Sequence, residues 1–243
     1  MTLGGKQLVS LPIEYAETQS IFSEITEKNH RSVLITSAVQ GEGVSTVAYA
    51  LAQKAAATGL KTLLLEFNTH TPFLADTLGI PSLNWSLDHL PDPNFMVSYS
   101  PKGLTFLAAP SQRSFSVNTR KSEFISAALE HFSSAFDLVI GDAPCLCHPN
   151  LNGIPTKMLA RHFSATILVV ATNKTSAGQV KRAVDQLTND EICIAGTVLN
   201  DQNYPSLYKE MERQFLKAGK LGNWIWKRVQ PTIRQAPFMT ENF

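Results

Sequence analysis

The residues best suited to chemistry lie in one stretch, Ser37 to Thr46, which reads SAVQGEGVST. This stretch follows the apolar run 32–36 and precedes the run 47–55, which is rich in helix-forming residues. A strand, a glycine-containing loop and a helix form the context of a phosphate-binding loop, in which backbone N–H groups and a helix N-terminus point at one anion. Gly41 and Gly43 would let the backbone wrap closely around that anion.

One position of this motif carries an unexpected residue. A phosphate-binding loop has a lysine between its last glycine and the first hydroxyl residue, and here that position is Val44. Valine neither donates a hydrogen bond nor neutralises charge, whereas Ser45 and Thr46 keep the hydroxyl groups of the motif. The sequence therefore predicts the architecture of a nucleotide site with part of its chemistry missing.

The elements around this stretch alternate between strand and helix patterns. The predicted strands are 32–36, 61–67, 104–108, 136–142, 165–171 and 192–200. The predicted helices are 13–28, the run from the loop to about 58, 71–79, 122–134, 156–161, 177–188 and 208–217, and residues 80–100 read as a loop-rich excursion. This order predicts an α/β fold, in which a mostly parallel twisted sheet has helices on both faces in three layers.

Ligands of such sheets bind beyond the carboxyl ends of the strands. The phosphate loop, Glu66, Asp142 and Asn200 all fall at predicted strand ends. We expect an irregular arm over residues 1–12, one P-loop NTPase-like domain over 13–208, and a C-terminal helix with a basic and aromatic tail over 209–243.

Composition excludes several classes of protein. The net charge of +1 over 243 residues gives no bulk field for nucleic acid. No window approaches the ~18–20 apolar residues of a membrane span, and no apolar run after Met1 suggests a signal peptide. The cysteines offer no disulfide framework, so we expect a cytosolic protein. The spacing of Cys145, Cys147 and His148 is poor for a closed zinc site, and buried thiols are expected there instead.

Four stretches resemble bacterial tyrosine kinases of the capsule and exopolysaccharide type, which belong to the class of partition and septum-site P-loop ATPases. The stretches are Thr36 to Thr46, Leu63 to Asn68 followed by Pro72, Phe136 to Pro144, and Gly196 to Asn200. They resemble, in turn, the phosphate loop, the second phosphate-site motif, the magnesium-site strand and the strand that ends at the adenine. The resemblance covers roughly residues 13–203 and implies the P-loop NTPase fold.

The resemblance assigns roles to individual residues. It implies nucleotide contacts by Gly41, Glu42, Gly43, Val44, Ser45, Thr46 and Asn200. It implies magnesium ligation by Ser45, Glu66 and Asp142 if nucleotide binds, with the two acids as residual catalytic-site groups. The expected cofactor is ATP or ADP with magnesium, bound weakly.

The departures from the family weaken the predicted catalysis. The loop lysine is Val44, and Glu66 and Asn68 stand where the family usually has two aspartates. No arginine precedes Arg31, although the family's first helix carries arginines that help to build a ring of subunits, and the tail has no tyrosine cluster. Because phosphoryl transfer depends on neutralising phosphate charge, we expect neither efficient ATP hydrolysis nor efficient tyrosine kinase activity.

The leading hypothesis is therefore a degenerate kinase-like protein that acts as a binding or regulatory component of exopolysaccharide or capsule synthesis and export. It would lie on the cytoplasmic side of the cell membrane and contact a membrane-anchored chain-length regulator. The first alternative is an active ATPase or tyrosine autokinase with a substitute cation from Lys174 or from a partner. The second is a partition or septum-positioning ATPase-like protein.

The tail is the remaining feature of the sequence. Residues 213–234 carry basic and aromatic side chains without acids, a composition that suits an anionic membrane surface or a partner groove. The basic residues are Arg213, Lys217, Lys220, Lys227, Arg228 and Arg234, and Trp224 and Trp226 lie among them. Packing of the tail on the domain is the structural alternative.

Overall fold

A computed structural model describes residues 16–69, 72–80, 85–87, 89–91, 96–99, 103–109, 121–147, 153–172 and 174–201. The helices are α1 (Ala16–Glu27), α2 (Val44–Ala57), α3 (Phe73–Leu78), α4 (Ser122–Ala135), α5 (Thr156–Ala160) and α6 (Ala177–Thr188). The strands are β1 (Ser32–Ser37), β2 (Thr62–Glu66), β3 (Val97–Tyr99), β4 (Leu104–Leu107), β5 (Leu138–Asp142), β6 (Ala165–Ala171) and β7 (Ile194–Asn200). The predicted α/β alternation is confirmed.

The strands form one seven-stranded sheet in the order β3-β4-β2-β5-β1-β6-β7. Strand β1 pairs in parallel with β5 and β6, and β2 pairs in parallel with β4 and β5. The N–H of Thr166 donates to Cys193 and that of Thr172 to Asn200, so β7 runs in the same direction as β6. The carboxyl ends of these strands consequently meet at one edge, where ligands bind in sheets of this kind.

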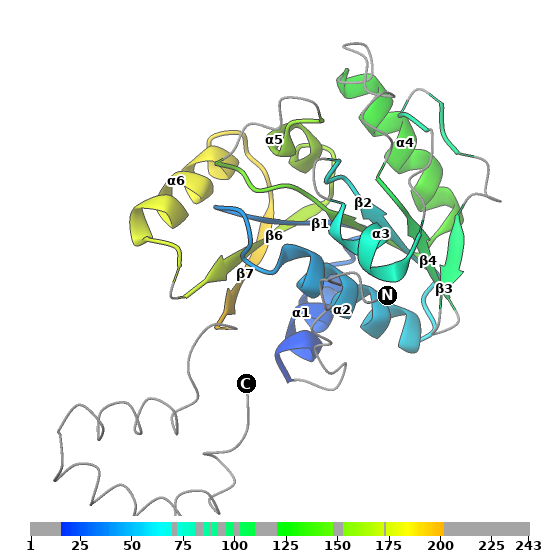
Figure 1. Ribbon diagram of the computed structural model, residues 1–243, viewed down its shortest axis with the longest axis horizontal. Helices are drawn as coiled ribbons and strands as arrows, with labels where there is room; N and C mark the ends of the chain where they lie inside the picture. Colours follow the sequence, from blue (N-terminus) through cyan, green and yellow to red (C-terminus); the bar gives the residue numbers. More distant parts are fainter. Residues whose placement is uncertain are drawn as a thin grey trace, which may run out of the picture. The chain divides into compact units, whose positions relative to one another are not determined.

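Helices cover both faces of the sheet, as Figure 1 shows. Side chains alternate between the faces along each strand, so Val33 and Ile35 of β1 join the apolar cluster formed with α1, α2 and α3. Leu34, between them, joins the cluster formed with α4 and α5. Strands β1, β2, β5 and β6 are buried along their whole length, as expected for parallel strands covered on both sides.

Strand β3 corrects the expectation for residues 80–100. We expected a loop-rich excursion, but Val97–Tyr99 pairs in antiparallel register with β4. A strand of three residues at the sheet edge leaves too short an alternation to read from sequence. The predicted helix over 208–217 and the tail 213–234 lie outside the described residues. No helix in the described ranges is long and apolar enough to cross a membrane.

Candidate functional site

The phosphate-loop stretch has the predicted strand, loop and helix geometry. Ser37 ends β1 and Val44 begins α2, and the loop between them turns at Gly41 and Gly43. These glycines have φ angles of 77° and 92°, in the left-handed region that other residues rarely adopt. Gly43 directly precedes α2, whose first backbone N–H groups have no carbonyl partner within the helix. The loop therefore ends at a helix N-terminus suited to an anion.

Side chains inside the loop hold it to the protein. Glu42 is 1% exposed, and its carboxylate accepts a hydrogen bond of 2.7 Å from the N–H of Val39 and another from the hydroxyl of Thr175. Val44 packs on the apolar cluster beneath α2. Of the predicted nucleotide contacts, Glu42 and Val44 thus have their side chains engaged within the protein, which leaves their backbone groups for a ligand.

The two predicted magnesium-site acids lie side by side. Glu66 ends β2, Asp142 ends β5, and the two residues are direct partners in the parallel register. Both are buried, with 0% and 2% of their surfaces exposed. Because they occupy the same position on neighbouring strands, their side chains lie on the same face of the sheet, the face covered by α2 and α3.

The surroundings of these two acids differ. Glu66 accepts hydrogen bonds from the N–H groups of Leu74 and Ala75 at 2.8 and 3.2 Å, so its carboxylate binds the N-terminus of α3. Asp142 accepts a hydrogen bond from Ser45, and its Oδ2 atom has no hydrogen-bond partner within the described residues. A buried carboxylate oxygen without a partner is unusual in a folded protein and is available to a ligand.

Burial makes ionisation of this pair unfavourable. It raises the pKa of Glu66 to about 8, with a further contribution from the charge of Asp142 and an opposing one from the two N–H groups of α3. Burial also raises the pKa of Asp142 to about 7, against the hydrogen bond from Ser45. Near neutral pH the pair therefore retains protons that a bound cation would displace.

Lys174 brings a positive charge to the phosphate loop. Its ammonium donates hydrogen bonds to the carbonyl oxygens of Gln40 and Gly41, at 2.5 and 3.2 Å. The lysine precedes α6, whose N-terminus is fixed by a capping box between Ser176 and Gln179. The sequence indicates this lysine as a substitute cation, and in the structure its ammonium contacts the loop.

Two further residues of the predicted site, Asn68 and Asn200, lie at or just beyond strand ends. Asn68 follows β2 and is half-buried. Asn200 ends β7, and its carbonyl accepts a hydrogen bond of 3.1 Å from the N–H of Thr172. Asn200 belongs to a second compact unit made of Ala171–Asn173 and Asn200–Phe243, separate from the unit that holds the loop. Its role beside an adenine stays a prediction.

Comparison with known proteins decides the lineage. No protein-family model matches the chain. The tyrosine-protein kinase YwqD of Bacillus subtilis is 26% identical to it over 180 residues, which are 72% of this chain and 73% of that protein. The chain is a homologue of bacterial tyrosine kinases. This agrees with the family that the four sequence stretches resemble.

Solved structures share the fold of this kinase homologue. The chimerical protein CapA2B2 has a TM-score of 0.64 and 21% identity, over 78% of this chain and 86% of that one. The septum site-determining protein MinD of Pyrococcus horikoshii, solved with Mg-ADP, has a TM-score of 0.58 and 16% identity, over 72% of each chain. At these identities the likeness concerns the fold alone, which is the P-loop NTPase-like α/β fold.

The buried acids and Ser45 of this chain fit a magnesium ion. Magnesium prefers oxygen ligands and keeps several waters, which one or two carboxylates and a nucleotide phosphate complete. Asp142 offers an oxygen without a partner, and Ser45 offers a hydroxyl beside it. Glu66 is already hydrogen-bonded to α3, so it would act through a magnesium-bound water. The ion would supply the charge that shields phosphate oxygens.

Sequence reasoning missed the contact between Glu42 and Thr175, which ties the loop to the segment before α6. It missed as well that Glu66 binds the N-terminus of α3. Among the described residues, no group of three or more histidine, cysteine or acidic side chains could hold a metal, and the expectation about zinc near Cys145 stays a prediction. Cys145 is buried, and His148 lies outside the described residues.

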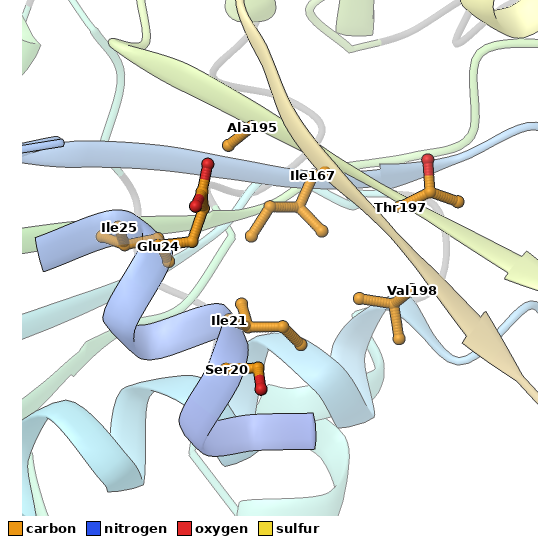
Figure 2. Close-up of a pocket in the computed structure, with 9 residues that line it drawn as sticks. Ser20, Ile21, Glu24, Ile25, Ile167, Ala195, Thr197 and Val198 are labelled. Carbon is orange, nitrogen blue, oxygen red and sulfur yellow. The ribbon is translucent and has the colours of Figure 1, made fainter. Parts of the chain in front are cut away.

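A separate cavity of about 190 Å³ lies between α1 and the strands β6 and β7. Figure 2 shows Ile21 and Glu24 of α1 on one side and Ile167, Thr197 and Val198 of the strands on the other. Its walls are mainly aliphatic, and Glu24 is paired with Lys28 at 2.5 Å. None of the phosphate-loop residues or buried acids lines it.

Proposed function

We propose that this kinase homologue is a degenerate P-loop protein that binds nucleotide weakly and regulates exopolysaccharide or capsule synthesis and export. One observation carries the proposal: the loop keeps its glycine turns and helix N-terminus, while Val44 packs on the core where the phosphate-binding lysine belongs. The cradle of N–H groups is retained without the loop's own cation. Efficient ATP hydrolysis and tyrosine kinase activity are not expected from such a site.

The acids support the same proposal. Asp142 stands unchanged from the family pattern, and its unpartnered oxygen suits magnesium. Glu66 already accepts hydrogen bonds from the N–H groups of Leu74 and Ala75. Asn68 has an amide side chain, which cannot act as a base. We therefore assign the backbone of 41–46 and the hydroxyls of Ser45 and Thr46 to phosphate, and Ser45, Asp142 and Glu66 to a magnesium ion that arrives with it.

We further propose that the protein works at the cytoplasmic face of the membrane, with a membrane-anchored chain-length regulator as its partner. The kinase resemblance is the support for this assignment. The tail 213–234 is the proposed docking element, because basic and aromatic residues suit an acidic partner groove or an anionic surface. Partner binding that is unchanged after truncation at Gly219 would rule out this role for the tail.

The test of the proposed site combines calorimetry with turnover. Mg-ATP and Mg-ADP are titrated into wild type and into Val44→Lys, and hydrolysis and autophosphorylation are measured on both. We expect weak binding and background turnover for wild type, and tighter binding for the variant. Wild-type hydrolysis at rates typical of the tyrosine kinases would contradict the proposal, as would unchanged affinity in Val44→Lys.

A second candidate function is an active ATPase or autokinase with a substitute cation. The ammonium of Lys174 on the loop carbonyls favours this candidate. The turnover measurement above separates it from the regulatory function. A positioning ATPase of the septum class has only the fold likeness to MinD in its favour, and localisation to the septum or the chromosome would support it.

A further inference from the structure

We propose that Lys174, which belongs to the segment before α6, supplies the cation that Val44 lacks and positions the terminal phosphate of a bound nucleotide. This inference rests on the proposed function in one respect, namely that the loop still binds nucleotide. It adds a residue that the phosphate-loop motif itself does not contain, since Lys174 lies far beyond Val44 in the chain.

The ammonium of Lys174 lies against the phosphate loop. It donates to two successive carbonyls of the loop, those of Gln40 and Gly41. A Cβ atom added at Gly41 would lie 2.7 Å from Lys174 Nζ, so the ammonium rests directly against the turn of the loop. The two residues are far apart in sequence, and the contact therefore reflects the fold rather than local chain geometry.

The residues that follow Lys174 anchor it beside the loop. The next residue, Thr175, donates its hydroxyl to the buried carboxylate of Glu42 inside the loop. The residue after it, Ser176, caps α6, where its hydroxyl accepts a hydrogen bond from the N–H of Gln179 at 3.3 Å. Two fixed neighbours thus hold the backbone at Lys174 beside the loop, while its side chain is exposed.

The ammonium of Lys174 would prefer an anion to its present carbonyl partners. Lysine offers three donors on a flexible stem, and here two of them bond to neutral carbonyl oxygens. A bond from an ammonium to a phosphate oxygen joins two opposite charges, whereas a bond to a carbonyl oxygen involves only the charge of the ammonium. A phosphate bound at the loop would therefore compete with these carbonyl oxygens for Nζ.

Lys174 also has a purely structural alternative, in which it only fastens the loop. The two roles differ in their dependence on Val44. If Lys174 replaces the missing lysine, then restoring a lysine at position 44 makes Lys174 dispensable. If it only fastens the loop, its loss affects both backgrounds equally. A double-mutant cycle between the two positions therefore separates the roles.

The experiment measures Mg-ADP and Mg-ATP affinity by calorimetry for wild type, Lys174→Met, Lys174→Arg, Val44→Lys and the double variant Val44→Lys/Lys174→Met. Lys181→Met, which removes an exposed lysine of α6, is the matched control. We expect Lys174→Met to weaken both affinities by about tenfold or more, and Lys174→Arg to stay within about threefold of wild type. In the Val44→Lys background the loss should shrink to less than about threefold.

The other outcomes contradict either the role of Lys174 alone or the nucleotide site as well. If wild type binds nucleotide and Lys174→Met binds equally well, the role of Lys174 is wrong and the proposed function stands. Equal losses in both backgrounds, together with a lowered melting temperature, would assign Lys174 to loop structure alone. If wild type binds neither nucleotide, the proposed weak nucleotide site and this inference both fail.

Discussion

Two buried carboxyl groups, Glu66 and Asp142, make the stability of this protein depend on pH. An unfolded chain ionises them near their ordinary pKa values of 4.5 and 3.8, whereas the folded protein keeps their protons up to about 8 and 7. The folded state binds more protons in this window, so the free energy of unfolding falls as pH rises from about 4 to about 8.

The corresponding prediction concerns Asp142→Asn. Removing one charge of the pair should raise the free energy of unfolding at pH 8.5 by roughly 1–3 kcal/mol and flatten its dependence on pH. Urea denaturation at pH 5.5 and 8.5 in magnesium-free buffer measures the effect, with Asp185→Asn on the exposed face of α6 as control. Magnesium should stabilise wild type at pH 8.5 and leave Asp142→Asn unaffected. An equal pH dependence in both proteins would contradict the buried-pair interpretation.

Gly141, beside Asp142, tests how closely the floor of the site is packed. A Cβ atom there would lie 2.8 Å from both Leu34 Cδ1 and Phe163 Cζ, and 3.1 Å from Phe67 Cε2. We expect Gly141→Ala to lower the free energy of unfolding by roughly 1–3 kcal/mol through overpacking. Gly178→Ala is the control, because nothing lies within 4 Å of the added Cβ and alanine favours the helix. Thermal melts that rank the variants in the opposite order would contradict this packing.

At the scale of elements, helix α3 depends on Glu66. The helix has only six residues, and its N-cap residue, Pro72, provides no side-chain hydrogen bond. The carboxylate of Glu66 takes the place of that cap by accepting from two N–H groups of the first turn. The acid that ends β2 therefore has a structural role besides any role at a metal.

Replacing Glu66 by the shorter aspartate should detach it from α3. We expect Glu66→Asp to lower the free energy of unfolding by about 1 kcal/mol and to speed amide hydrogen exchange in Phe73–Leu78. Exchange measured by mass spectrometry tests this, with Glu130→Asp on the exposed side of α4 as control. Unchanged protection of α3 would show that other contacts hold the helix.

Local elements of this protein were predictable, and contacts between distant elements largely were not. The turn at Gly41 and Gly43 depends on residues within one stretch, and the helix over 177–188 follows from its own pattern and cap. Strand ends placed Glu66 and Asp142 at one edge, but their direct register depends on how β2 and β5 pair. No sequence pattern signalled that Glu66 caps α3 or that Thr175 bonds to Glu42.

At the scale of the whole molecule, the absence of basic residues from α1 bears on assembly. The resemblance implies a ring that uses arginines of the first helix, whereas α1 carries Glu17, Glu24 and Glu27 and no arginine. Like charges on this helix would oppose a contact that relies on opposite ones. We expect size-exclusion chromatography with light scattering to show no ring, with or without Mg-ATP. A closed ring that forms on adding nucleotide would contradict this expectation.

The bond between Glu66 and α3 also constrains how this site could acquire the aspartates that the kinase resemblance implies. Changing Glu66 to aspartate first would release the helix before any gain at the metal, so that path begins with a loss of stability. Placing a capping residue at position 72 first, for example by Pro72→Ser, would give α3 a cap that does not depend on Glu66. The order of the two substitutions therefore decides whether stability is lost on the way, and the short helix constrains position 66 even though it lies outside the phosphate loop.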